Sequence, residues 1–235
     1  MTRILLSWSS GKDSAWALHV LKQRREYEIA GLLTTFNQAA NRVAMHAVRR
    51  ELVEAQAKEA GIPLWPVELP WPCSNGDYEA AMRAACSKAV AQRIEAVAFG
   101  DLFLEDVRAY RERQMRDTGL QPVFPIWGLS TSELARQMIA AGLRAKLTCV
   151  DPKVLDASFA GREFDAELLQ DLPAEVDPCG ERGEFHSFAY AGPPFQRGLE
   201  VAVGEVVARD GFVFADVSWA ASHAGGSTRA TNASL

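Results

Sequence analysis

The first 150 residues alternate short apolar runs with longer amphipathic segments, a pattern typical of a parallel sheet covered by helices. The apolar runs predict strands at residues 3–8, 29–36, 64–69, 96–100 and 122–126. The amphipathic segments predict helices at residues 13–24, 44–60, 77–92, 105–117 and 131–141. In the second helix, Val48, Leu52 and Ala55 recur at helical spacing, and Gly61 ends the element. Because crossovers between parallel strands are right-handed, this order predicts a doubly wound α/β sheet.

The pattern changes from about Leu143 onward. A further strand is expected at residues 145–150 and a helix near 163–172, followed by a loop rich in Gly and Pro. Residues 199–208 and 212–219 then flank Arg209-Asp210-Gly211, which is a strong hairpin signal. We therefore expect an N-terminal domain at residues 1–142 and a smaller α+β domain at 143–219. Residues 220–235 have too little apolar content to order themselves and predict a disordered tail.

Composition and charge narrow the class of protein. The net charge of −5, from 25 basic and 30 acidic residues, argues against a dedicated nucleic-acid binder, which needs a basic face. The four cysteines form no Cys-x-x-Cys pair, so neither a zinc site nor an oxidoreductase motif is indicated. No signal peptide opens the chain, and no apolar run approaches the ~20 residues of a membrane span. We expect a cytoplasmic protein without a membrane partner.

Residues 7–14, Ser-Trp-Ser-Ser-Gly-Lys-Asp-Ser, lie between the first predicted strand and the first predicted helix. A tight turn that enters a helix leaves backbone N–H groups unpaired at the positive end of the helix dipole, so it favours an anion. The loop is not a Walker A loop, because Leu6 and Asp13 stand where that motif needs Gly and Ser or Thr. A turn in which Ser10 or Ser14 only caps the helix would have the same composition.

The loop resembles the Ser-Gly-Gly-x-Asp-Ser loop of the ATP pyrophosphatase (PP-loop) superfamily, whose members cleave ATP between its α- and β-phosphates. The resemblance implies a five-stranded sheet of order 3-2-1-4-5, with ATP phosphates held by Ser9, Ser10, Gly11, Lys12, Asp13 and Ser14. In that order the first and fourth strands are neighbours, so Gly100 and Asp101 face the loop. Mg²⁺ prefers one or two carboxylates together with phosphate oxygens, which makes Asp13 and Asp101 the expected metal ligands. The other interpretation of Asp101 is a cap on the following helix.

The adenine base is expected against the end of the second strand. There, Thr34, Thr35 and Phe36 offer backbone hydrogen bonds and an apolar wall. His46, in the predicted helix that follows, is a candidate for the same pocket. A histidine on the surface of that helix fits the sequence equally well, because His is intermediate in burial.

A second polar stretch, Asp-Pro-Cys-Gly-Glu-Arg-Gly-Glu-Phe-His-Ser-Phe at residues 177–188, contains two carboxylates, Glu181 and Glu184, near glycines. By spacing alone, a solvated acidic loop would look the same. This stretch, the phosphate loop, Phe-Gly-Asp at 99–101 and Ala-Gly-Pro-Pro-Phe at 191–195 together resemble the bacterial branch of the diphthine–ammonia ligase family. Shorter matches support the resemblance, at residues 45–46, 56–57, 125–127 and 133–134.

The resemblance implies an AMP-forming carboxylate–ammonia ligase whose cofactors are ATP and Mg²⁺. The enzyme would adenylate a carboxylate with release of pyrophosphate, and free ammonia would then displace AMP. Four residues are implied in catalysis: Lys12 near the phosphates, Asp13 at the metal, and Glu181 and Glu184 to orient the acceptor or ammonia, or to assist proton removal. The family loop commonly has Gly where Ser10 stands, and a positive φ there would cost a serine about 1 kcal/mol.

Several questions stay open at this level. Diphthine occurs on a translocation factor of eukaryotes and archaea, so the carboxylate acceptor here is either a small molecule or a protein side chain. The alternatives to the ligase are an ATP-binding sensor without catalysis and a PP-loop enzyme that modifies tRNA. The acidic balance and the lack of paired cysteines weigh against the tRNA enzyme. Apolar segments are compatible with a homodimer, but the sequence locates no interface.

Overall fold

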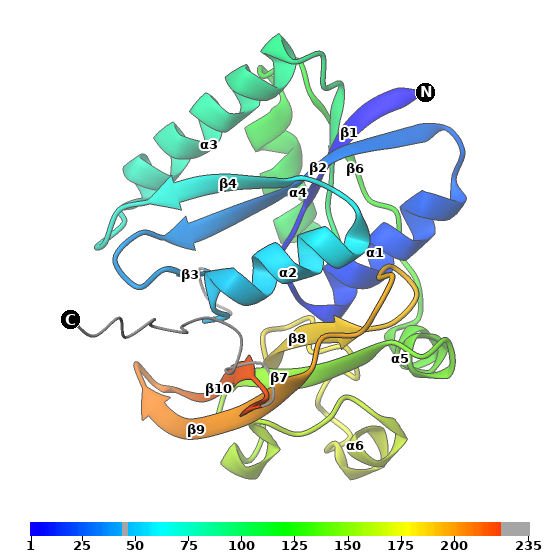
Figure 1. The fold of residues 1–235 in the computed structure, drawn as a ribbon, viewed down its shortest axis with the longest axis vertical. Coiled ribbons are helices and arrows are strands. Elements are labelled where there is room, and N and C mark those ends of the chain that lie inside the picture. Colours follow the sequence, from blue (N-terminus) through cyan, green and yellow to red (C-terminus); the bar gives the residue numbers. More distant parts are fainter. Residues whose placement is uncertain (44–46, 222–235) are drawn as a thin grey trace, which may run out of the picture.

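The computed structural model describes residues 1–43 and 47–221 of the chain. Sheet A is formed by five parallel strands, β4 (Leu64–Leu69), β2 (Tyr27–Asn37), β1 (Thr2–Ser7), β5 (Ala96–Ala98) and β6 (Gln121–Val123), in that order. A two-residue strand, β3 (Arg42–Val43), adds to β2 in the antiparallel direction. The parallel strands confirm the predicted order 3-2-1-4-5, and the antiparallel β3 is an addition that was not predicted (Figure 1).

Helices cover both faces of sheet A, which confirms the doubly wound arrangement. The helices of this part are α1 (Lys12–Gln23), α2 (Arg50–Ala60), α3 (Asn75–Ala91), α4 (Glu105–Met115) and α5 (Thr131–Ala140). Successive residues of a strand point to opposite faces. In β1, Ile4 and Leu6 belong to the apolar cluster that contains α1 and α2 residues, whereas Leu5 packs with Cys86 of α3 and Met115 of α4. The alternating side chains of β1 therefore contribute to two apolar cores, one on each face of sheet A.

The second helix begins later than predicted. It starts at Arg50, and before it the N–H of Val43 donates to the carbonyl of Val48 at 2.9 Å. Ala47 takes a positive φ of 55°, a backbone conformation that a helix does not contain. Residues 44–46, including His46, lie outside the described residues.

The C-terminal part forms a separate antiparallel sheet B, of order β8-β7-β10-β9. Its strands are β7 (Arg144–Val150), β8 (Phe185–Ala191), β9 (Val201–Arg209) and β10 (Phe212–Trp219), with a 3-10 turn η1 (Ala157–Phe159) and a short helix α6 (Ala166–Asp171). The predicted hairpin is confirmed, and Asp210 and Gly211 at its turn both have positive φ. Strand β8 was missed, because its residues were expected to belong to a loop. The domain boundary expected after residue 142 stays a prediction, and residues 222–235 of the expected tail lie outside the described part of the chain.

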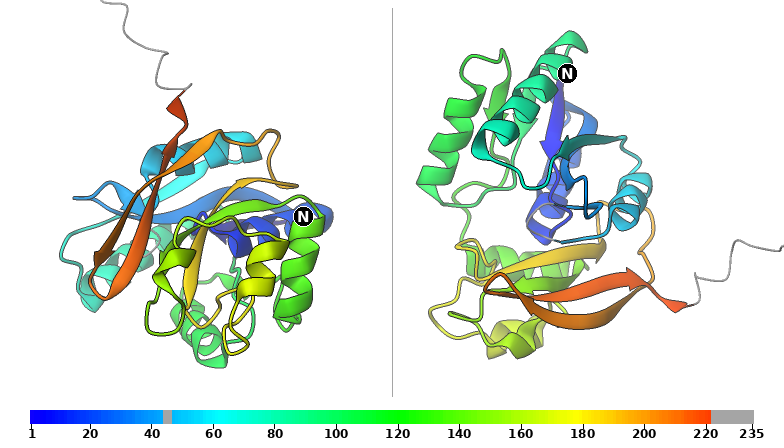
Figure 2. Two further views of the ribbon diagram at one scale, coloured as in Figure 1. Left: turned by 90° about the horizontal axis from the view of Figure 1, so that it is seen from below. Right: turned by 90° about the vertical axis from the view of Figure 1, so that its left-hand side faces the viewer.

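Strand β8 joins the two sheets. It packs on α1, and the N–H of Ala189 donates to the carbonyl of Ser10 at 2.9 Å. The side chain of Gln56 in α2 donates to the carbonyls of Ser10, at 3.0 Å, and Ala189, at 2.5 Å, and accepts from the indole N–H of Trp8 at 3.0 Å. Figure 2 shows β8 on the side of sheet B nearest sheet A, with β9 farther away. The phosphate loop is thus held between α2 and β8.

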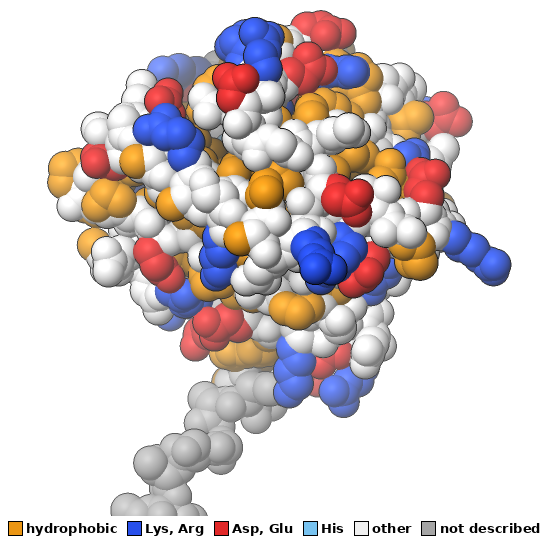
Figure 3. All heavy atoms as spheres, turned by 90° about the horizontal axis from the view of Figure 1, so that it is seen from above, with side chains coloured by type: hydrophobic (Ala, Val, Ile, Leu, Met, Phe, Trp, Pro, Cys, Tyr) orange, Lys and Arg blue, Asp and Glu red, His pale blue; other side chains and the backbone are white. Residues whose placement is uncertain are grey.

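The face of the molecule seen in Figure 3 can be examined for the basic patch that nucleic-acid binding needs. On the part of the face in Figure 3 that the structure describes, basic and acidic side chains are interspersed, without a continuous basic patch. Among the described residues, no helix is long and apolar enough to cross a membrane.

Candidate functional site

The phosphate loop connects β1 to α1 through residues 8–11. Ser10 adopts φ of +69°, so the departure from glycine noted in the sequence falls on a left-handed position. Gly11 is the N-cap of α1 and has no side chain to cap it, but the N–H of Lys12 in the first turn donates to the hydroxyl of Ser187 at 3.2 Å. The hydroxyl of Ser14 instead donates to the carbonyl of Gly11 at 2.9 Å. The interpretation of this turn as a helix cap formed by Ser10 or Ser14 is therefore wrong, and the positive end of the helix dipole still favours an anion at the start of α1.

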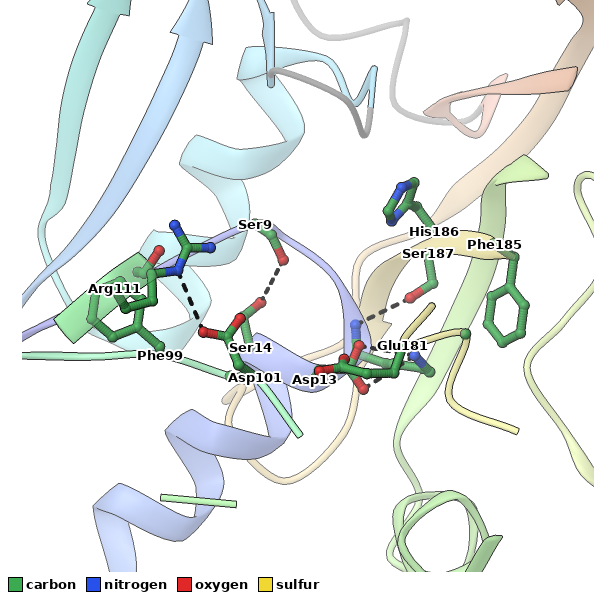
Figure 4. Close-up of a pocket in the computed structure, with 14 residues that line it drawn as sticks. Ser9, Asp13, Ser14, Phe99, Asp101, Arg111, Glu181, Phe185, His186 and Ser187 are labelled. Carbon is green, nitrogen blue, oxygen red and sulfur yellow. Dashed lines mark hydrogen bonds and ion pairs between the residues drawn. The ribbon is translucent and has the colours of Figure 1, made fainter. Parts of the chain in front are cut away.

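A cavity of about 250 Å³ lies in front of this loop (Figure 4). It brings together the end of β1, the start of α1, the end of β5 and the segment at residues 177–184 before β8, which we call the acidic loop. The predicted site residues that line it are Ser9, Lys12, Asp13, Ser14, Gly100, Asp101 and Glu181. The lining residues that sequence reasoning missed are Ser7, Phe99, Arg111, Gly180, Phe185, His186 and Ser187. Five of these seven stand directly beside a predicted residue or within the polar stretch at residues 177–188, so proximity in sequence could have indicated them.

The end of β5 contacts the phosphate loop closely. A Cβ on Gly100 would lie 3.1 Å from the backbone of Asp13 and Ser14, which is tighter than most Cβ contacts, so this close approach favours glycine. Asp101 faces the cavity, and its carboxylate accepts from the Nε of Arg111 at 3.4 Å. The cap interpretation of Asp101 is wrong, because the N-cap of α4 is Leu104. The parallel pairing of β1 with β5 thus places the carboxylate of Asp101 and the guanidinium of Arg111 at the same cavity as the N-terminus of α1.

Lys12 is buried and fully engaged within the protein. Its ammonium donates to the carboxylate of Asp13 at 2.9 Å and to the carbonyl of Cys179 in the acidic loop, and it lies 5.1 Å from the centre of the Phe185 ring. Burial lowers the pKa of Lys12, but Asp13, Cys179 and Glu181 together more than offset this, so the pKa is raised and the ammonium stays charged. Lys12 therefore ties the phosphate loop to the acidic loop, and its predicted contact with phosphate stays a prediction.

Glu181 is the carboxylate of the acidic loop that reaches the cavity. Its Oε1 accepts from the N–H of Leu102 at 2.7 Å, just after the end of β5. Burial raises the pKa of Glu181 to about 7, and the carboxylates of Asp13 and Asp101 add to the shift, although the Leu102 hydrogen bond opposes it. A group that titrates near neutrality beside a phosphate loop is suited to proton transfer.

Glu184 is placed differently from Glu181. It is buried and does not line the cavity, and its two carboxylate oxygens accept from the N–H groups of Asp177 and Arg182, both at 2.9 Å. Asp177 is also turned inward, accepting from the N–H of Cys179 at 2.9 Å and from the hydroxyl of Thr131 at 2.6 Å. These contacts indicate that Glu184 holds the shape of the acidic loop, and its direct role in catalysis remains a prediction.

The residues expected at adenine do not assemble at this cavity. The hydroxyl of Thr34 is buried and donates to the carbonyl of Trp8 at 2.9 Å. Phe36 is buried beneath Arg50, and neither these residues nor Thr35 line the cavity. His46 lies outside the described residues, so the adenine position stays a prediction.

The carboxylates at the cavity fit a magnesium–phosphate complex better than a metal held by protein alone. Within residues 1–43 and 47–221, no group of three or more His, Cys, Asp or Glu side chains is gathered as a metal site. Mg²⁺ usually takes only one or two carboxylates and completes its shell with phosphate oxygens and water. Asp13 and Asp101 provide that number, each beside a cationic side chain with which Mg²⁺ would compete.

Comparison with known proteins follows the same division into two parts. A family model described as the diphthamide synthase N-terminal domain matches residues 1–122, and the diphthamide synthase C-terminal domain matches residues 130–218. Curated proteins named diphthine–ammonia ligase are 29% identical in Rattus norvegicus and 27% in Homo sapiens over 133 residues. Each match covers 54% of this chain and 50% of the relative, so the chain spans about half the length of these relatives. The N-terminal family model alone matches more than half of the residues of this chain, and the chain therefore belongs to the diphthamide synthase family.

Proposed function

We propose that the protein is an ATP-dependent ligase that joins a carboxylate to ammonia through an acyl adenylate. The observation that carries the proposal is the single cavity that is lined by both the N-terminal turn of α1 and Glu181. The names of the relatives, diphthine–ammonia ligases, describe the same class of reaction. The first feature suits a polyphosphate, and the second suits a proton transfer at the group that reacts with it.

In this proposal the phosphate loop holds the β- and γ-phosphates of ATP. Ser9, Asp13 and Ser14 line the cavity at the start of α1, and Arg111 adds a positive charge from α4. Asp13 and Asp101 would hold Mg²⁺, which supplies charge neutralisation to the phosphates when it is bound. The protein's main contribution is to position the reactants and to stabilise the charge of the leaving pyrophosphate.

The chemistry then takes two displacements. A carboxylate oxygen of the acceptor attacks the α-phosphorus, and the bond to the bridging oxygen breaks, so that pyrophosphate leaves with the electron pair. Ammonia next attacks the acyl carbon, the bond from carbon to the AMP oxygen breaks, and AMP leaves. The attacking nitrogen must lose a proton, and ionised Glu181 is the group in the cavity that can accept it.

The test is to follow the products of ATP. Purified protein is incubated with Mg-ATP and ammonium, with and without a small-molecule extract of its host, and AMP with pyrophosphate is measured against ADP with phosphate. We expect extract-dependent AMP and pyrophosphate. ADP and phosphate would contradict the proposal, and tight ATP binding without any AMP would favour the nucleotide sensor.

A variant pair makes the same test specific to the cavity. Asp101→Asn removes a carboxylate that faces the loop, and we expect it to raise the Mg²⁺ concentration needed for half-maximal AMP formation. Asp106→Asn is the control, because Asp106 is exposed in the first turn of α4 and does not line the cavity. Equal Mg²⁺ dependence in the two variants would contradict the place given to Asp101.

A further inference from the structure

A second and larger cavity, of about 470 Å³, adjoins the phosphate cavity. Both parts of the chain form it: the ends of β2 and β4 on one side, and β7 with the β9–β10 hairpin on the other. His186, next to the acidic loop, lines this cavity and the phosphate cavity alike. Its volume is within the roughly 300–1,000 Å³ of small-molecule pockets. A ligand here would therefore lie beside the proposed reaction site.

The walls of this second cavity are mainly apolar. They include Leu69, Pro70, Trp71, Phe212 and Phe214. Trp71 is 69% exposed, although a large aromatic side chain normally gains by being covered. An apolar ligand in the cavity would bury these surfaces and would need no hydrogen bonds in return.

The polar side chains at this cavity already have partners in the protein. The Oδ1 of Asn37 accepts from the N–H groups of Ala39 and Ala40, both at 3.0 Å. Arg42 donates to the carbonyl of Ala47 at 2.6 Å and to Asp216 at 2.8 Å. A nucleobase buried here would compete for these groups or leave its own polar edge unpaired, which costs free energy. The cavity is thus better suited to an apolar group than to adenine.

Charge at the mouth favours an acid. Arg209 lies in the turn region of the hairpin, 60% exposed, with its guanidinium 4.9 Å from the centre of the Phe214 ring and 3.7 Å from the carboxylate of Asp210. An exposed ion pair of this length contributes little by itself, so the guanidinium can attract a carboxylate from solvent. Toward the phosphate cavity, the imidazole of His186 is neutral at pH 7, because burial lowers its pKa to about 4. A neutral imidazole provides one donor and one acceptor nitrogen.

We infer that this cavity binds the apolar body of the carboxylic acid substrate, with its carboxylate directed past His186 to the phosphate loop. The inference rests on the proposed function and names the substrate class: a monocarboxylic acid with an aromatic or branched apolar body. The reacting carboxylate is the group adenylated in the first displacement, and the apolar body takes no part in bond making.

The test measures binding of 3-phenylpropionate by isothermal titration calorimetry. The protein is first saturated with Mg²⁺ and α,β-methylene-ATP, whose methylene bridge prevents cleavage, and acetate serves as the acid without an apolar body. Ala40→Trp places a large side chain at the cavity from an exposed turn, and Ala39→Trp is the matched control. The two alanines are neighbours with the same backbone hydrogen bond to Asn37, but only Ala40 lines the cavity.

We expect the wild type and Ala39→Trp to bind 3-phenylpropionate more tightly than acetate. Ala40→Trp is expected to weaken 3-phenylpropionate binding about tenfold or more, because its side chain occupies the ligand's volume. Its affinity for the nucleotide analogue should stay within about twofold of wild type. Equal binding of the two acids by wild type, or equal binding of 3-phenylpropionate by the two variants, would overturn the inference.

A weakened nucleotide affinity in Ala40→Trp would overturn it in another way, by assigning the cavity to adenine. The proposed function has a separate readout, since its failure shows as ADP in place of AMP in the wild-type turnover assay. The two assays therefore distinguish an error in the inferred substrate class from an error in the proposed ligase reaction.

Discussion

Replacing Ser10 with glycine is expected to stabilise the protein in the absence of nucleotide. At φ of +69° an L-residue is strained by about 1–2 kcal/mol. Among the described residues, the Ser10 hydroxyl is also a buried group without a hydrogen-bond partner, and such a group costs about 1–3 kcal/mol. Glycine removes both the backbone strain and the unpaired hydroxyl, but its greater loss of backbone entropy on folding costs about 0.5–1 kcal/mol. The net increase in the free energy of unfolding is therefore about 2 kcal/mol.

Ser10→Ala separates the two terms, because alanine loses the hydroxyl and keeps the strained Cβ. We expect alanine to be about 1 kcal/mol more stable than wild type, and glycine about 1 kcal/mol more stable than alanine. For a chain of 235 residues, each 1 kcal/mol moves Tm by about 2–4 °C. The assay is thermal unfolding of the three proteins by circular dichroism, without nucleotide. If glycine is no more stable than alanine, the strain argument is refuted, and if neither exceeds wild type, the hydroxyl is satisfied in solution.

Three further substitutions test the site. Gly100→Ala should displace the phosphate loop, because its Cβ would meet the backbone of Asp13, and we expect weaker Mg-ATP binding by calorimetry than in the control Gly76→Ala, whose Cβ has room. Glu184→Gln leaves one buried N–H without its acceptor and should lower the free energy of unfolding by about 1–3 kcal/mol in denaturant titrations. At a constant concentration of free ammonia, Glu181→Gln should remove a rise in the rate of amide formation as pH increases through about 7, measured from pH 5.5 to 8.5.

Each of these has a result that would contradict it. Equal nucleotide affinity in the two glycine variants would show that the loop tolerates a Cβ at residue 100. A Glu184→Gln protein as stable as wild type would show that the acidic loop does not depend on that carboxylate. For Glu181, a raised pKa means that the folded protein binds the proton more tightly than the unfolded chain, so its contribution to stability falls between about pH 4.5 and 7. Glu181→Gln should therefore gain stability relative to wild type at pH 8 compared with pH 4, and an unchanged difference would refute the shift.

Elements that depend on residues close together in the chain could be predicted from the sequence. The apolar runs gave the parallel strands, and the Arg209-Asp210-Gly211 turn gave the β9–β10 hairpin, since positive φ at Asp210 and Gly211 suits a two-residue turn. Strand β8 is different, because its partner β7 lies far back in the chain and its own segment follows a loop rich in Gly and charge. Pairing over such a distance leaves no local pattern, so the sequence alone predicts a loop where this strand lies.

The site divides in the same way. The phosphate loop and Phe99-Gly100-Asp101 were found because each follows a strand at the edge where parallel strands end. Glu181 and Glu184 could not be distinguished by sequence, since both stand beside glycine in one polar stretch. Burial and hydrogen bonding separate them, with Glu181 at the cavity and Glu184 within the loop. His186 acquires its position from β8, so it could not be assigned before that strand was known.

Lys12 shows how the two halves of the site depend on each other. A buried ammonium is tolerated only while its charge and its hydrogen bonds are matched, and removing one partner of such a group costs about 3–5 kcal/mol. For Lys12 these partners come from both halves, since Asp13 belongs to the phosphate loop and the carbonyl of Cys179 belongs to the acidic loop. Any movement that separates the two loops would expose the Lys12 ammonium to water or leave it buried without one of its partners. The nucleotide side and the acceptor side of the cavity are therefore expected to move as one unit, which keeps Glu181 in place beside the phosphates.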